Sequence, residues 1–154
     1  MKSIILILSL GAASAVAFAS VAVHPNGLVK TAKSTKPLLN GAEIDPPVRA
    51  ILERSCQNCH SERTEWPWYS YIAPASWRVE GDVAQARDHM NLSHWDEYTK
   101  ENKDEILAQV SVVARSGEMP PARYTTIHTN AKLSAEEREQ NYQWARTERR
   151  HAKK

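Results

Sequence analysis

The sequence predicts an all-α fold, a small domain of about four helices joined by long loops. Three observations predict it. Four segments carry apolar residues at the i, i+3, i+4 spacing of a helix that buries one face. We find no segment with the alternating pattern that is typical of a strand. The length, 154 residues, suits one domain with one core.

The N-terminus has the pattern of a secretory signal, which we assign to residues 1–19. Lys2 is followed by an apolar run over residues 4–18, and Ala17 and Ala19 form an A-x-A cleavage pattern. We therefore expect export to the periplasm. The alternative is an uncleaved membrane anchor, although the run is shorter than the ~20 residues that a spanning helix needs. Contact with a membrane is expected only in that case.

The rest of the chain divides into three parts. Residues 20–43 are rich in Lys, Thr, Ser and Asn without periodicity, and we expect a flexible tether. Residues 44–150 hold the helical segments and form the expected domain, and residues 151–154 are a basic tail. The formal net charge is only +2, so we expect no nucleic-acid partner. The single phenylalanine lies in the signal, and a bound apolar cofactor would complete a core that is poor in large apolar side chains.

The expected helices cover residues 46–59, 76–90, 102–116 and 134–150. The residues that can cap their N-termini are Asp45, Ser76, Asn102, and Ser134 together with Glu137 in a capping box. Pro46 suits the first position of the first helix, and Gly117 is expected to end the third. The first helix therefore runs directly into the two cysteines of the chain.

Both cysteines lie in the motif C-x-x-C-H, formed by Cys56, Cys59 and His60. This motif is the attachment sequence of c-type haem. At the end of a helix, the two thiols reach the two vinyl groups at one edge of the porphyrin, and the histidine lies beneath the iron. The motif therefore predicts one covalently bound haem c, with Cys56 and Cys59 in thioether bonds and His60 as an axial ligand.

Other uses of the two cysteines are less well supported. A zinc site needs a second pair of ligands, which the sequence does not supply. A thioredoxin-type redox site needs alternating strands and helices, which the pattern does not predict. A disulfide at this spacing would close a very small loop and remove little entropy from the unfolded chain.

Further stretches of the sequence resemble the bacterial haem-binding-domain family of c-type cytochromes. They are CQNCHSERTEWPWYSYIAPASW, NLSHW, GEMPPARYTTIH and AKLSAEE, and together they cover about residues 46–144. That family carries C-x-x-C-H with a Trp-Pro-Trp-Tyr loop and a later Met-Pro-Pro. The resemblance implies haem binding, a small single-haem domain of the cytochrome c type whose first and last helices pack together, and in some members an association with di-haem peroxidases.

The second axial ligand of the iron has four candidates: Met119, His89, His94 and His128. We prefer Met119, because Gly117 ends the preceding helix and the two prolines after Met119 hold an extended loop. His128 lies in the same loop region and is the alternative sixth ligand. Met119 could instead fill a gap in the core.

Aromatic residues follow the motif closely. We expect Trp66, Trp68, Tyr69 and Trp77 to line the haem pocket, with ordinary core packing as the alternative for each. The candidate partners of the haem propionates are Arg63, Arg78 and Arg87. The carbonyl of Pro67 or Pro74 is expected to accept a hydrogen bond from the far nitrogen of His60.

These features predict an exported c-type cytochrome that transfers single electrons. No nucleophile–base pair or pair of catalytic acids stands out, so we do not expect an enzyme, although peroxidase-like chemistry at an open iron is an alternative. The expected partners are the cytochrome c maturation machinery and a redox protein such as a periplasmic peroxidase or oxidase. The basic tail is a candidate docking element for an acidic partner. The alternative functions are a haem-based sensor of small ligands and an accessory to a di-haem peroxidase.

Overall fold

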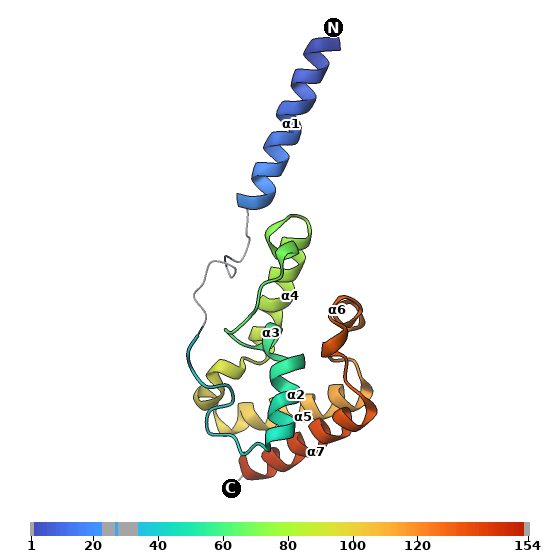
Figure 1. Cartoon of the computed structure of the whole chain (residues 1–154). Coiled ribbons are helices and arrows are strands. Elements are labelled where there is room, and N and C mark those ends of the chain that lie inside the picture. The colour runs from blue at the N-terminus through green and yellow to red at the C-terminus, as the bar shows by residue number, and fades with distance from the viewer. Residues whose placement is uncertain (1, 23–26, 28–33, 153–154) are drawn as a thin grey trace. The chain divides into compact units, whose positions relative to one another are not determined.

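The computed structural model describes residues 2–22, 27 and 34–152 (Figure 1). This part of the chain is helical and contains no strand, which confirms the all-α prediction. Its α-helices are α1 (Lys2–Ala22), α2 (Pro46–Ser55), α3 (Gln57–His60), α4 (Ala75–His89), α5 (Lys100–Ser116), α6 (Ala122–Ile127) and α7 (Ala135–Ala152). Short 3₁₀ helices lie between them: η2 (Trp68–Tyr71), η3 (Leu92–Glu97) and η4 (Thr129–Ala131).

The chain divides into two compact units. The first unit comprises Met1–Ala32 and Glu65–Gln85, and the second comprises Lys33–Thr64 and Ala86–Lys154. The second unit contains α2, α3, α5, α6 and α7, and with them both cysteines. The two cysteines of the C-x-x-C-H motif therefore lie in the second unit.

The N-terminal expectations meet the structure only in part. Residues 2–19 of the predicted signal lie in α1. Among the helices that the structure describes, none is both long and apolar enough to cross a membrane. The tether expected over residues 20–43 is too long, because Leu38 and Leu39 are 4% and 2% exposed and belong to the core of the second unit. Within that range, residues 23–26 and 28–33 lie outside the described residues.

α2 carries the apolar face that the sequence predicts. Pro46 occupies its first turn, whereas Asp45 makes no capping hydrogen bond. The apolar side chains that it buries are Val48, Ile51 and Leu52. The helix expected over residues 46–59 is divided at Cys56, where φ is −119° and ψ is −35°. The backbone then starts again as α3, so the first cysteine lies at the joint between two helices.

Two predicted N-caps are wrong. Ser76 is fully buried inside the first turn of α4, and its backbone N–H already donates to the oxygen of Ile72 over 3.0 Å. α5 is capped by Thr99, whose Oγ1 accepts a hydrogen bond from the backbone N–H of Asn102 over 3.2 Å. The first backbone N–H groups of a helix need acceptors outside it, and here residues earlier in the chain supply them. Both helices therefore begin before the residue that we expected to cap them.

α7 begins with the predicted capping box. Glu137 N donates to Ser134 Oγ over 3.1 Å, and Ser134 N donates to the Glu137 carboxylate over 2.9 Å. α7 continues to Ala152, so the expected tail over residues 151–154 begins inside the helix. α5 and α7 run side by side in opposite directions, and α2 also contacts α7, as we expected of the first and last helices (Figure 1). Together with η3 they enclose the core, which includes Leu52, Leu92, Trp95, Leu107, Trp144 and Ala145.

Candidate functional site

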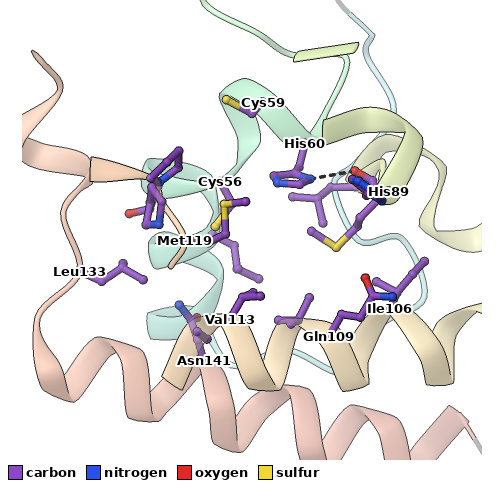
Figure 2. Close-up of a pocket in the computed structure, with 18 of the residues that line it drawn as sticks. Cys56, Cys59, His60, His89, Ile106, Gln109, Val113, Met119, Leu133 and Asn141 are labelled. Carbon is purple, nitrogen blue, oxygen red and sulfur yellow. Dashed lines mark hydrogen bonds between the residues drawn. The ribbon is translucent and has the colours of Figure 1, made fainter. Parts of the chain in front are cut away.

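A cavity of about 270 Å³ opens in the second unit, close to the ~300–1,000 Å³ of typical small-molecule sites. Cys56, Cys59 and His60 lie on its wall (Figure 2). The remainder of the lining is largely apolar and comes mainly from α5, α7 and the loop after α5. It includes Leu52, Ile106, Val110, Val113, Ala114, Leu133 and Trp144. A ligand in this cavity would therefore be surrounded mainly by hydrocarbon.

The short helix α3 holds the motif in one helical turn. Cys59 N and His60 N both donate to the backbone oxygen of Cys56, over 3.2 and 3.0 Å. Both thiols are free rather than joined in a disulfide. Burial raises the pKa of the Cys56 thiol to about 12, so it is protonated at neutral pH. Redox and metal-binding cysteines need the thiolate, which this environment disfavours.

His60 is oriented by backbone carbonyl groups, those of Met90 and Ala86. Its Nδ1 lies 3.1 Å from the backbone oxygen of Met90, in the second unit (Figure 2). A carbonyl only accepts, so Nδ1 carries the proton and Nε2 keeps its lone pair. Burial lowers the pKa of His60, which favours the neutral ring that a metal needs. The expectation that Pro67 or Pro74 would supply this carbonyl is wrong, because the carbonyl belongs to Met90, 30 residues after His60.

The loop after the motif is tied down from two sides. Ser61 Oγ donates to the oxygen of Gln57 over 2.6 Å, and Thr64 Oγ1 donates to the oxygen of Asn58 over 2.7 Å. Arg87 donates to Ser61 O over 2.8 Å and to Thr64 Oγ1 over 3.0 Å. Arg87 was a candidate partner for haem propionates, but in the structure its guanidinium holds this loop.

Two of the four candidates for the second axial ligand line the cavity, namely Met119 and His89. His128 is not among the lining residues, and its ring stacks on Tyr124 with 4.3 Å between centroids. His94 is held by Glu62 and Glu97, each 2.8 Å away. The structure thus brings Met119 to the same cavity as His60, while its role as a ligand stays a prediction.

The four aromatic residues predicted for the pocket belong to the first unit, and none is among the residues that line this cavity. Trp68 and Trp77 are 75% and 46% exposed. The role predicted for Trp66, Trp68, Tyr69 and Trp77 therefore stays a prediction. The tyrosine and tryptophan side chains that do line the cavity are Tyr124 and Trp144, which we did not expect as site residues. Trp144 lies next to buried Ala145 in α7, so the helical period contained a signal for it.

The residues present fit a haem. The cavity offers an imidazole whose Nδ1 is bonded to Met90, two thiols that are free of a disulfide, and a largely apolar wall. It also holds Asn141, only 2% exposed, whose Oδ1 has no hydrogen-bond partner among the described residues. A buried amide without a partner is unfavourable in an apolar surrounding and is more readily understood at a ligand site. In the described part of the chain, no group of three or more His, Cys, Asp or Glu could hold a metal ion by itself.

Comparisons with known proteins indicate haem binding. A family model described as a haem-binding domain matches residues 15–147. Cytochrome c peroxidase Ccp of Escherichia coli (strain K12) is 30% identical over 102 residues, which are 64% of this chain. The chain spans only 22% of the length of that relative. No solved structure matches.

Proposed function

The chain belongs to the haem-binding-domain family, and we propose that it is a c-type cytochrome that binds one haem covalently and transfers single electrons. The observation that carries this proposal is the placement of Cys56, Cys59 and His60 in one turn on the wall of a largely apolar cavity. When bound, the haem supplies an iron that changes between the ferrous and ferric states. The protein would supply the attachment, the ligands to the iron and a largely apolar surrounding.

Each residue of the site has a distinct task in this proposal. The thiols of Cys56 and Cys59 hold one edge of the haem, and His60 presents Nε2 with its ring fixed by Met90. Met119 would supply a neutral, soft thioether as a second protein ligand to the iron. A neutral ligand and an apolar wall favour the less charged ferrous state, so they raise the reduction potential.

Location and partners complete the proposal. The signal at residues 1–19 would direct the chain to the periplasm, where the cytochrome c maturation machinery attaches haem. The similarity to a protein named cytochrome c peroxidase suggests a peroxidase as the electron acceptor. The chain itself would act as an electron carrier and not as an enzyme.

Haem staining after denaturing electrophoresis tests the covalent bond, because only thioether-linked haem stays with the denatured chain. The full chain, expressed with the maturation machinery, should stain, whereas residues 20–154 made in the cytoplasm should not. A Cys56→Ala/Cys59→Ala variant that still stains would contradict the assignment. The single variant Cys56→Ala, which keeps one thiol, is the matched control and should stain weakly.

A sensor of small ligands is the second candidate, and one observation favours it. Met119 is 43% exposed and follows Gly117 in a loop, so its thioether could leave the iron for a diatomic gas. Carbon monoxide distinguishes the two functions. If the visible spectrum of the reduced protein is unchanged by the gas, the iron is six-coordinate and electron transfer is supported, whereas a shift supports sensing.

A further inference from the structure

A second cavity, of about 440 Å³, lies beside the first. Met119, Pro120 and Leu133 belong to the walls of both cavities. The rest of its lining comprises three threonines and two cations beside two small residues: Gly117, Ala122, Thr125, Thr126, Thr129, Lys132 and Arg138. No acidic side chain lines it among the residues that the structure describes. A largely apolar cavity and a cationic one therefore share the segment that carries Met119.

The two cations of this second cavity lack an ion-pair partner in the described part of the chain. Nearby charges are paired: Glu137, one residue before Arg138, lies 2.8 Å from Arg54. Arg138 also lies in the first turn of α7, where the helix dipole disfavours a cation. Its guanidinium lies against the backbone of Gly117, since a Cβ there would come within 2.5 Å of Nη1. The position of Arg138 is thus not explained by pairing within the chain.

The segment of the chain around Met119 is both cationic and rich in exposed apolar side chains. Residues 111–134 contain Arg115, Arg123 and Lys132 against the single acid Glu118, a formal charge of 3 − 1 = +2. That equals the formal charge of the whole chain, +2. In the described part of the second unit, the large apolar side chains that are exposed also lie here: Val112 is 64%, Met119 43% and Ile127 65% exposed. Exposed apolar groups framed by cations are typical of a protein-binding surface.

We propose that the surface formed by Met119, Lys132 and Arg138 around the second cavity, together with the exposed Ile127 of α6, whose neighbours Thr125 and Thr126 line that cavity, docks the acidic face of a redox partner; it is here called the Met119 surface. The inference rests on the proposed electron-transfer function. The cations attract and orient a carboxylate-rich partner, and the apolar side chains make the dry contact. Because Met119 lies in the walls of both cavities, a partner docked here is next to the proposed iron ligand.

The basic tail carries less of this role. In the last turns of α7, Arg149 is bonded to Asp104 at 2.5 Å, and Arg150 is bonded to Thr147 at 3.0 Å. The charge of Arg149 is therefore already paired with a carboxylate within the chain. The docking surface consequently lies beside Met119 and not at the C-terminus.

Electron transfer to small complexes of opposite charge tests the inference on the haem-loaded full chain. Ferricyanide stands in for the carboxylates of the partner, and tris(phenanthroline)cobalt(III) is the cationic counterpart. At low salt, Lys132→Glu/Arg138→Glu should slow the reaction with ferricyanide about 10-fold and speed the reaction with the cobalt complex. Both differences should vanish near 1 M salt. The matched control is Arg150→Glu, which reverses one charge in the last turn of α7 and should change neither rate by more than about 2-fold.

Several outcomes would overturn the inference. They are unchanged rates in the double variant, or an Arg150→Glu effect as large as that of Lys132→Glu alone. If Arg138→Glu fails to fold, Arg138→Gln and the exposed Lys132→Glu replace it. In the unmodified protein, the ferricyanide rate should fall with salt, and the opposite trend would also reject the inference. A chain without haem would instead refute the proposed function, since haem content is measured before the rates.

Discussion

At the scale of single residues, Met119 is the proposed iron ligand whose substitution would distinguish electron transfer from sensing. We expect Met119→Ala to abolish the weak far-red sulfur-to-iron band of the oxidised protein and to open the iron to carbon monoxide. The potential should fall by on the order of 100 mV, a modest part of the ~0.8 V that axial ligands span. Met119→His should restore six-coordination at low potential. Absorption spectroscopy and redox titration measure these effects.

Two histidines provide the controls for that experiment. His128 stacks on Tyr124 outside the cavity lining, so His128→Ala should keep the band and the potential. His89 is the other candidate ligand that lines the cavity, so His89→Ala tests whether it binds the iron in place of Met119. If Met119→Ala keeps the band while His89→Ala changes the potential, the assignment of Met119 is wrong.

His94 should make stability depend on pH. Hydrogen bonds to Glu97 and then Glu62 raise its pKa. Because the folded-state pKa lies above the unfolded value of about 6.5, the stabilisation is complete below that pH. It is lost as the pH rises through the folded-state pKa. The Tm of the haem-loaded protein should therefore decrease over this window, and His94→Gln should remove that step. An unchanged slope in His94→Gln would contradict the assignment.

At the scale of helices, Gly117 sets where α5 ends and the Met119 loop begins. Its φ is +77°, and an added Cβ would lie 2.5 Å from Arg138 Nη1. We expect Gly117→Ala to lower the free energy of unfolding by about 1–2 kcal/mol, measured by denaturant unfolding. The matched control is Gly81→Ala, inside α4, where an added Cβ meets nothing within 4 Å. That variant should stabilise by about 0.5–1 kcal/mol, and equal effects at both glycines would refute the argument.

The helices themselves were predictable because their signals are local. The capping box of Ser134 and Glu137 and the stop at Gly117 are encoded within a few residues, and both are confirmed. The hydrogen bond from His60 to Met90 joins residues 30 positions apart, so no local pattern contains it. The burial of Leu38 is a tertiary effect of the same kind. The sequence therefore predicts a chemistry for the motif, whereas the groups that orient His60 could not be predicted from it.

At the scale of the whole molecule, the core of the second unit is built around a cavity. The cavity opens to solvent, so in a chain without haem its apolar walls would contact water, which disfavours the folded state. Burial of the haem would remove this contact, so we infer that cofactor attachment and folding are coupled.

Removal of both attachment points tests this coupling. Cys56→Ala/Cys59→Ala should purify without covalent haem and should lose cooperative thermal unfolding, as followed by circular dichroism at 222 nm. The single variant Cys56→Ala is the control: one remaining thioether keeps haem in the cavity and should preserve a cooperative transition at a lower Tm. Two methyl side chains in place of two thiols change the apolar lining very little, so the loss would come from the missing haem. If the double variant unfolds cooperatively at the Tm of the unmodified protein, the apolar core is sufficient by itself and the coupling is refuted.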